Sequence, residues 1–281
     1  MNDLELKEDG VLYVVATPIG NLEDITFRAI KVLESVDCIA AEDTRHTLKL
    51  LNHFNISKPL ISYYRHNEDD KSDFLIQKLL NGESIALVSD AGTPGICDPG
   101  QAIIYKCIQN GIKIVPIPGA CAMINALICS GLDTNKFKFM GFLSINKKIR
   151  KQELEEIKKS DVTIILYEAP HKLKDTLKDL ASALENRMIT IARELTKIHE
   201  EFVRGTANEL LQVFDNPKGE FVLIIEKTDK TQDEEKLILQ ELTLEQHYQY
   251  YLKKGFSKNE IIKRIAKDRN VNKNEIYKKF V

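Results

Sequence analysis

The chain has 281 residues, 43% apolar and 29% charged with a net charge of −2, which is typical of a soluble globular protein with room for two domains and a small third part. No apolar run approaches the roughly 20 residues of a membrane-spanning helix, and the polar start MNDLELKEDG is not a secretory or transit signal, so we expect a cytoplasmic protein. The five cysteines form no C-x-x-C pair, which argues against a structural zinc site.

Short β-rich runs alternate with amphipathic helical segments over most of the chain. We expect nine strands, at VLYVVAT, DCIAA, LISYY, SIALVSD, IKIVPI, FKFMGF, VTIILY, MITIAR and EFVLII. This alternation predicts an α/β fold with largely parallel sheets. Nine strands exceed one small sheet, and the polar stretch SGLDTNK separates the first five from the last four. We therefore predict two α/β domains, at residues 1–133 and 134–227.

The last part of the chain has a different pattern. The charged run KTDKTQDEEK (227–236) has no apolar period and is predicted to be a linker. From 237 to 281 the pattern is helical only, with a capping-box signature at Ser257 and Glu260, which predicts a small helical domain of helix-turn-helix type. Residues 253–281 contain ten Lys/Arg and three Asp/Glu, a net of +7, so the other 252 residues carry −9. This imbalance predicts an anionic partner for the tail.

The run VSDAGTPGICDPG (88–100) joins a predicted strand to a predicted helix. Its glycines allow backbone to approach a ligand closely, and its prolines stiffen the loop. A phosphate-binding loop would combine glycines with Lys and Ser/Thr, whereas this loop carries Asp90 and Asp98. Two carboxylates favour a ligand with hydroxyls, amines or positive charge, and S-adenosyl-L-methionine has all three. The alternative is that both aspartates only cap helices.

Two more Gly/Pro loops, ATPIGNLEDIT (16–26) and PIPGACA (116–122), also follow predicted strands. Ligands of open α/β sheets bind beyond the carboxyl ends of the strands, so we expect the three loops to converge on one crevice. The alternative, three unrelated turns, is less favoured.

Charged residues cluster directly after other predicted strands. They are Asp43 and Arg45, then His66 and Glu68, then Arg193, Glu194 and Lys197. Such residues could be solvated helix starts, interdomain ion pairs or the lining of the crevice. No second histidine supplies the spacing of a metal site, so we expect no metal.

Several runs resemble one known family. TPIGNLEDIT, AEDTR, HNE, VSDAGTPGICDPG, PGACA, GFL, YEAPH and RELTKIHEE occur in order over about residues 11–226 and resemble the ribosomal RNA small subunit methyltransferase I family of the tetrapyrrole methylase superfamily. The resemblance implies two α/β domains of tetrapyrrole methylase type with S-adenosyl-L-methionine between them, a homodimer and a small C-terminal helical domain. It also implies methylation of the 2′-hydroxyl of a cytidine in the decoding region of 16S ribosomal RNA, so the expected partner is small-subunit ribosomal RNA or the 30S subunit. Cys97, Cys121 and Ala169 are mild departures from the family pattern.

The resemblance also implies residue roles. The expected cofactor-binding residues are Pro18, Asp90, Ala91, Gly92, Ile96, Cys121, Ala122, Phe142, Tyr167 and Ala192. The residues expected to contact RNA or support the transfer are Arg45, Glu68, Arg193 and Glu194. The general base stays open among Glu23, Asp43, His66, Glu68 and Glu194. Arg45, Arg193 and Lys197 are candidates for steering phosphates or stabilising an alkoxide.

Two other functions stay open from the sequence. One is a small-molecule methylase that acts on a tetrapyrrole, which the basic tail disfavours. The other is a nucleic-acid-binding protein whose α/β part only senses a nucleoside.

Overall fold

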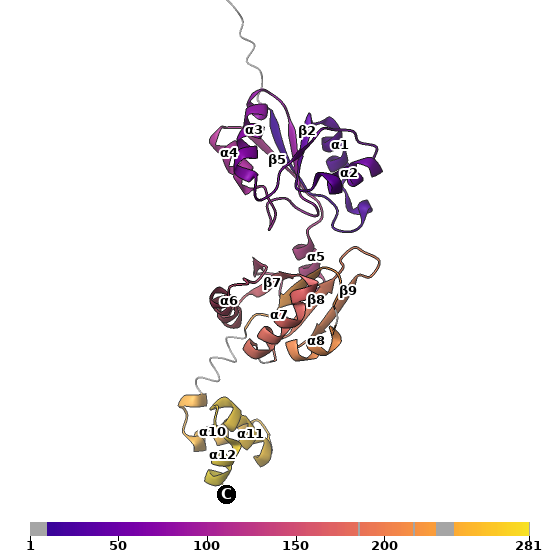
Figure 1. The fold of residues 1–281 in the computed structure, drawn as a ribbon. Helices are drawn as coiled ribbons and strands as arrows, with labels where there is room; N and C mark the ends of the chain where they lie inside the picture. The colour runs from indigo at the N-terminus through magenta and orange to yellow at the C-terminus, as the bar shows by residue number, and fades with distance from the viewer. Residues whose placement is uncertain (1–9, 185, 216, 229–238, 281) are drawn as a thin grey trace, which may run out of the picture. The chain divides into compact units, whose positions relative to one another are not determined.

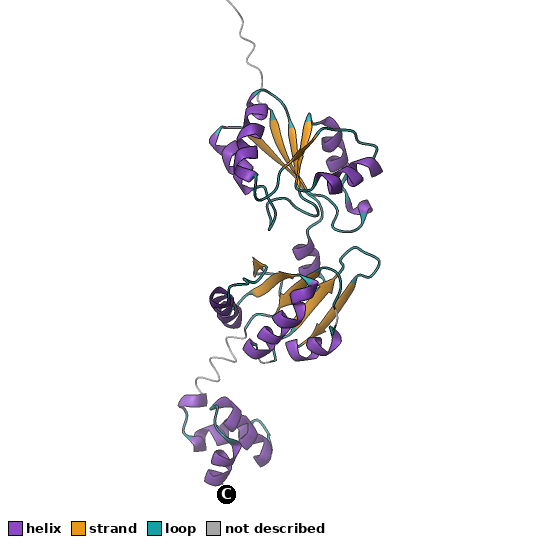
Figure 2. Cartoon of the chain, in the orientation of Figure 1, coloured by secondary structure: helices purple, strands orange, loops and turns teal. Residues whose placement is uncertain are grey.

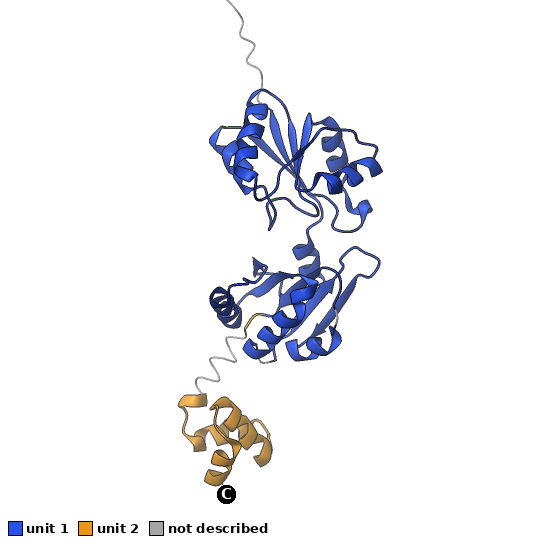
Figure 3. Cartoon of the chain, in the orientation of Figure 1, with its two compact units in different colours: residues 1–226 blue, residues 227–281 orange. Residues whose placement is uncertain are grey.

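The computed structural model describes residues 10–184, 186–215, 217–228 and 239–280. The described residues up to Glu226 form one compact unit, and those from Lys227 onwards form a second (Figure 3). All nine predicted strands are present, and a tenth that was not predicted lies at Glu201–Gly205. The predicted linker, 227–236, lies outside the described residues except for its first two. The predicted boundary near residue 133 stays a prediction.

The first sheet is parallel throughout, as predicted, with the strand order β3-β2-β4-β1-β5. Its strands are β1 (Val11–Val15), β2 (Cys38–Ala41), β3 (Leu60–Ser62), β4 (Ile85–Val88) and β5 (Lys113–Ile117). After the short 3₁₀ turn η1 (Leu22–Asp24), helices α1 (Phe27–Ser35) and α2 (Thr44–His53) cover one face of the sheet, and α3 (Glu68–Leu80) and α4 (Gln101–Gln109) cover the other (Figure 1). Strands β2 and β4 are buried along their whole length, which explains their unbroken apolar sequences.

The second sheet is mixed, so the prediction of largely parallel sheets is wrong for this half. Its order is β6-β7-β10-β8-β9, and only the β6–β7 pair is parallel. The strands are β6 (Phe137–Gly141), β7 (Thr163–Glu168), β8 (Ile189–Arg193), β9 (Glu201–Gly205) and β10 (Phe221–Ile225). Helix α5 (Ala122–Ile128) packs on one face, and α6 (Lys147–Lys159), α7 (Pro170–Ala183) and α8 (Ala207–Val213) pack on the other. Because β10 is antiparallel to β7 and β8, its first residue pairs with the last residue of each.

In the described residues of the second unit the secondary structure is helical (Figure 2), as predicted. Its helices α10 (Leu244–Lys253), α11 (Lys258–Asp268) and α12 (Lys273–Phe280) enclose a small core that includes Tyr251, Ile261, Ile265 and Ile276. The predicted capping box at the start of α11 is confirmed. The carboxylate of Glu260 accepts hydrogen bonds from the backbone N–H and the hydroxyl of Ser257. In the described part of the chain, none of the helices has the length and apolar character that crossing a membrane requires.

Candidate active site

A cavity of about 310 Å³ lies in the first unit, where loops from both sheets meet. The three Gly/Pro loops contribute Ile19, residues 91–93 with Ile96 and Asp98, and residues 121–122. Their predicted convergence is therefore confirmed. The opposite wall consists of Phe142, Tyr167 to Pro170, Leu195, and Glu220 to Val222.

The three loops are held together by hydrogen bonds. Thr17 and Gly92 exchange two backbone bonds of 2.8 and 3.0 Å, and the Thr93 hydroxyl donates to the carbonyl of Ala120 at 3.2 Å. Gly92 has a φ of +80°, and a Cβ there would lie 3.2 Å from the Cγ2 of Ile19. Glycine is thus required at the point where two loops cross beside the cavity.

The aromatic wall is built around Tyr167, the penultimate residue of β7. Its ring packs edge-on against Phe139 and Phe142, with centroid distances of 4.9 and 5.8 Å. Its hydroxyl accepts a hydrogen bond from the backbone N–H of Met123 at 3.3 Å. Burial raises the pKa of Tyr167, so this hydroxyl stays protonated at neutral pH and does not serve as a base.

The polar side of the cavity is acidic. Asp98 lines it, and burial, followed by the charge of Asp90, raises the pKa of the Asp98 carboxyl. Burial and the charge of Asp98 raise the pKa of Glu42 in the same way. No Lys, Arg or His occurs among the described residues that line the cavity. Such a lining disfavours a phosphate and suits a ligand that carries positive charge.

Seven of the ten predicted cofactor-binding residues line the cavity, namely Ala91, Gly92, Ile96, Cys121, Ala122, Phe142 and Tyr167. The other three do not. Pro18 is buried within its loop, and Ala192 is 1% exposed in the core beneath Tyr167 and Leu195. The Asp90 carboxylate turns toward α2 and accepts the backbone N–H of Asp43 at 2.9 Å.

Arg45 and Glu68 are engaged outside the cavity lining. The Arg45 side chain is 87% exposed and forms a two-point ion pair with Asp43, which holds the pKa of that carboxyl well below its usual range. The Glu68 carboxylate accepts the backbone N–H of Gly100 at 2.7 Å and the hydroxyl of Tyr63 at 3.4 Å. Glu68 therefore ties the start of α3 to the start of α4.

Glu194 lies beside the cavity through its contacts with Glu220. The Glu194 carboxylate accepts the ammonium of Lys197 and the backbone N–H of Glu220, both at 2.9 Å. Lys197 also donates to the carboxylate of Glu220 at 2.9 Å. Arg193 donates instead to the carbonyl of Lys218 and the carboxylate of Glu201. The remaining base candidates, Glu23, Asp43 and His66, are not among the lining residues.

Backbone strain occurs in two of the loops that border the cavity. Cys97, Glu194 and Thr196 adopt left-handed φ values of 64°, 50° and 67°. The Thr196 hydroxyl is buried and has no hydrogen-bond partner among the described residues. Residues held in unfavourable conformations cluster at ligand sites, where the surrounding structure enforces them.

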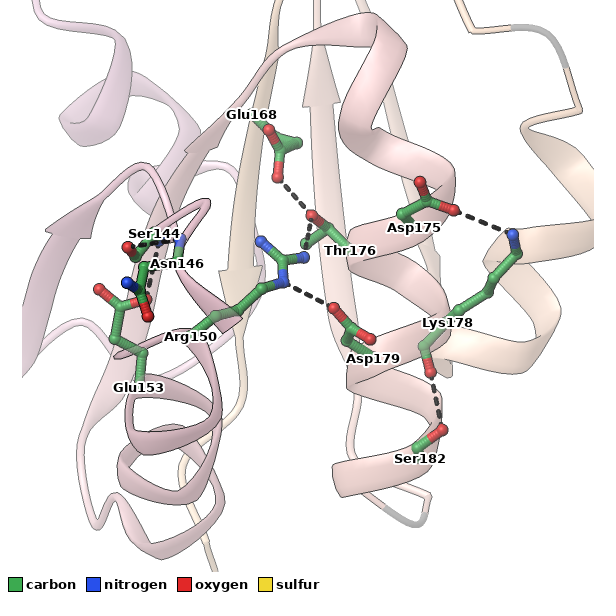
Figure 4. A network of polar contacts seen from close by, with 10 residues as sticks. All are labelled: Ser144, Asn146, Arg150, Glu153, Glu168, Asp175, Thr176, Lys178, Asp179 and Ser182. Atoms are coloured by element: carbon green, nitrogen blue, oxygen red, sulfur yellow. Dashed lines mark hydrogen bonds and ion pairs between the residues drawn. The ribbon is translucent and has the colours of Figure 1, made fainter. Parts of the chain in front are cut away.

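A network of polar side chains links the end of β7 to helices α6 and α7 (Figure 4). Glu168 is 4% exposed; it accepts the backbone N–H of Ala169 at 2.8 Å and the hydroxyl of Thr176 on α7. The Thr176 hydroxyl in turn accepts a hydrogen bond from the guanidinium of Arg150 on α6 at 2.8 Å. Arg150 also forms an ion pair with the carboxylate of Asp179 at 2.6 Å. One helical turn after Arg150, Glu153 accepts the backbone N–H of Ser144, two residues after Phe142. The segments that carry Phe142 and Tyr167 are therefore both linked to α6.

The sequence reasoning missed part of the cavity lining. The residues missed are Ile19, Thr93, Glu168, Ala169, Pro170, Leu195, Glu220, Phe221 and Val222. Phe221 and Val222 start a strand, and in the largely parallel sheets that we expected, strand starts lie at the edge away from the loops. Asp98 was considered together with Asp90 as a carboxylate suited to the ligand, but it was not among the expected cofactor-binding residues.

Comparison with known proteins gives consistent relatives. Residues 11–211 match the family described as Tetrapyrrole (Corrin/Porphyrin) Methylases. A ribosomal RNA small subunit methyltransferase I from Halalkalibacterium halodurans is 51% identical over 272 residues, covering 96% of this chain and 94% of that protein. Its counterpart from Bacillus subtilis is 49% identical over 271 residues, covering 95% and 93%.

Solved structures share the fold at low sequence identity. Uroporphyrin-III C-methyl transferase from Thermus thermophilus, complexed with S-adenyl homocysteine, has a TM-score of 0.56 at 13% identity and covers 77% of this chain and 97% of that one. A diphthine synthase has a TM-score of 0.59 at 17% identity and covers 78% and 91%.

Proposed function

The chain belongs to the ribosomal RNA small subunit methyltransferase I family, within the tetrapyrrole methylases, and from this membership and the cavity we propose that it methylates the 2′-hydroxyl of a cytidine in the decoding region of 16S ribosomal RNA. The methyl donor is S-adenosyl-L-methionine. The observation that carries the proposal is the lining of the cavity, which contains Asp98, Glu168 and Glu220 and no basic residue among the described residues.

The residues present fit this cofactor. An apolar and aromatic wall of Phe142, Tyr167 and Leu195 suits a nucleoside, while Asp98 supplies negative charge for an ammonium or sulfonium group. The close contact of Gly92 with Ile19 holds two of the cavity loops together beside this lining. When bound, the cofactor supplies an electrophilic methyl group. We propose that Pro18, Asp90 and Ala192 act from behind the lining by holding the loops and the sheet.

The chain's own contribution is then mainly positional. Methyl transfer is an in-line displacement, and correct alignment of two reactants alone lowers a barrier by roughly 7–11 kcal/mol. We propose that Glu194, linked through Lys197 to Glu220, supports the reacting ribose at the cavity mouth. Arg193 and the exposed Arg45 contact phosphates. Glu68 supports the site by fixing the start of α4 beside the loop at 88–100.

The proposal includes a cellular setting. Small-subunit ribosomal RNA, free or within the 30S subunit, is the substrate, and this places the enzyme in the cytoplasm. We also propose a homodimer, as the family resemblance implies.

Deletion of the gene tests the proposal in cells. Small-subunit ribosomal RNA from wild-type and deletion strains is digested, and methylated nucleosides are mapped by mass spectrometry. We expect one decoding-region cytidine to lose its 2′-O-methyl group, and a plasmid copy of the gene to restore it. An unchanged ribosomal RNA, or loss of a methylated tetrapyrrole instead, contradicts the proposal.

A further inference from the structure

The cavity does not account for the basic helical unit at the end of the chain. Residues 253–281 carry ten of the 40 Lys and Arg residues of the protein, and only three acidic residues. Two of those acids are occupied inside the unit. Glu260 caps α11 through Ser257, and Asp268 accepts the hydroxyl of Tyr251 at 2.6 Å and lies 3.1 Å from the ring nitrogen of the buried His247. With Glu241 and Glu245 counted, the described residues 239–280 contain ten Lys/Arg and five acidic residues, so this part of the unit keeps a net positive charge.

Two lysines of α11 lie on the side of the helix that faces away from the core of the unit. Ile261 and Ile265 point into the core and are fully buried. Two residues along an α-helix correspond to a rotation of about 200°, so Lys263 and Lys267 lie on the face opposite to Ile265. Both are exposed, and neither forms an ion pair with a described residue. Like charges four residues apart destabilise a helix slightly, so this pair adds nothing to the stability of α11.

Helix α12 repeats this arrangement. Ile276 is buried, and Asn274 and Lys278 lie two residues before and after it, on the outer face. Tyr277, next to them, is 46% exposed. The helices are joined by a tight turn, residues 269–272, in which Asn270 is left-handed with a φ of 52°. Two helices joined by a short turn, with at least one exposed lysine on the outer side of each, resemble a framework that many nucleic-acid-binding proteins use.

We infer that the outer sides of α11 and α12, defined by Lys263 and Lys267 on α11 and by Asn274 and Lys278 on α12, dock the phosphate backbone of the ribosomal RNA substrate. The inference rests on the proposed function for the identity of the RNA. Lysines supply charge to phosphates, and the exposed Tyr277 offers a ring on which an unpaired base stacks. Among the described residues of α11 and α12, Tyr277 is the only exposed large apolar side chain, which separates these helices from a membrane-binding helix. The role is affinity for RNA, separate from the methyl-transfer cavity.

The test uses the full chain with three changes, Lys263→Gln, Lys267→Gln and Lys278→Gln. A matched control removes the same charge from exposed lysines of α6, as Lys147→Gln, Lys148→Gln and Lys151→Gln. Binding to a decoding-region RNA fragment is measured over a range of salt concentrations. We expect the α11–α12 variant to bind roughly tenfold or more weakly, with a slope of log K against log salt that is shallower by about 2 to 3, because each phosphate contact contributes about 0.7–0.9.

Separate measurements distinguish this inference from the proposed function. In the α11–α12 variant, cofactor affinity and the methylation rate at saturating RNA are expected to stay at wild-type values while the KM for RNA rises. If wild type, the α11–α12 variant and the α6 control have equal RNA affinity and equal salt slope, the inference about α11 and α12 is wrong and the proposed function stands. The same holds if the α6 control loses as much RNA affinity as the α11–α12 variant. Weaker binding to assembled 30S subunits without weaker binding to bare RNA also overturns it, because the partner would then be a protein. A wild-type enzyme that methylates no ribosomal RNA overturns the proposed function instead.

Discussion

Asp98 is the carboxylate best placed to respond to a cationic ligand. It lines the cavity, and no basic residue shares that lining. Burial and then the charge of Asp90 raise the pKa of the Asp98 carboxyl, so its ionisation is costly without a cation nearby. A bound cation stabilises the ionised form and reverses that effect. Cofactor binding is therefore linked to loss of a proton from Asp98.

This linkage predicts a pH-dependent affinity. The raised pKa means that Asp98 takes up its proton at a higher pH than an ordinary aspartate, so affinity is full above that pKa and falls as the pH drops through it. We expect Asp98→Asn to weaken S-adenosyl-L-methionine binding by roughly ten- to hundredfold at pH 7.5, the range for a lost hydrogen bond to a charged group. The variant's affinity should also change less between pH 7.5 and 5. Titration calorimetry at both values measures this.

The control for this experiment is Asp70→Asn, on the exposed side of α3. It should leave both the affinity and its pH dependence unchanged. If Asp98→Asn binds as tightly as wild type, or keeps the same pH dependence, Asp98 does not face the cation.

Sequence reasoning at the residue scale identified loops better than individual side chains. Asp90 and Asp98 lie in the same predicted loop, yet the Asp90 carboxylate accepts the N–H of Asp43, the N-cap residue of α2, whereas Asp98 lines the cavity. The sequence did not separate these two positions, and contact of either carboxylate with a ligand stays a prediction. Glu68 likewise bonds to Gly100, which lies 32 residues away in the sequence. Such pairings depend on tertiary structure and leave no local pattern.

At the scale of elements, α6 and α7 control the shape of the cavity wall. The bonds from Arg150 through Thr176 to Glu168 run from a cation through a hydroxyl to an anion, so every member is satisfied. Thr176 is fully buried and occupies a core position of α7, between Leu173 and Leu180. In the sequence, a polar residue at a core position of a helix indicates a buried hydrogen bond. The sequence does not show which residues are its partners.

Removal of the Thr176 hydroxyl should damage both stability and cofactor binding. Thr176→Val keeps the shape of the side chain but leaves the buried Glu168 without that donor and Arg150 without that acceptor. A buried polar group that loses its partner costs about 1–3 kcal/mol, which urea unfolding measures. Because Glu168 follows Tyr167 directly, we also expect a higher Kd for S-adenosyl-L-methionine.

Thr176→Ser is the matched control, because it keeps the hydroxyl and should restore the cofactor Kd to near the wild-type value. Equal effects of valine and serine would show that the site responds to volume and not to the hydrogen bonds. A valine variant that loses stability but binds the cofactor normally would make the network purely structural.

Strand direction was the main element-scale property that the sequence did not reveal. The apolar runs located nine strands, but run length and composition are similar in parallel and antiparallel strands that are buried on both faces. The strand β9 was missed because EFVRG follows a run of mixed charges and is only partly buried. The first sheet was predicted correctly because every one of its strands is followed by a helix or a Gly/Pro loop.

At the scale of the molecule, the chain combines a methyl-transfer unit with a basic helical unit. The residues outside 253–281 carry −9, a charge that repels RNA, while the tail carries +7. This separation of charge is consistent with two binding sites, since the cavity binds a cationic cofactor and other surfaces bind the polyanionic substrate. The central claim is that both act on the same molecule of ribosomal RNA.

Methyl transfer with the purified protein tests that claim most directly. The full chain is incubated with S-adenosyl-L-methionine labelled in its methyl group and with 30S subunits or 16S ribosomal RNA from the deletion strain, and the labelled nucleoside is identified after complete digestion. The account predicts one label per RNA, in 2′-O-methylcytidine from the decoding region, with much less label for Asp98→Asn. Label on a base, label at many positions, or no label with either substrate contradicts it.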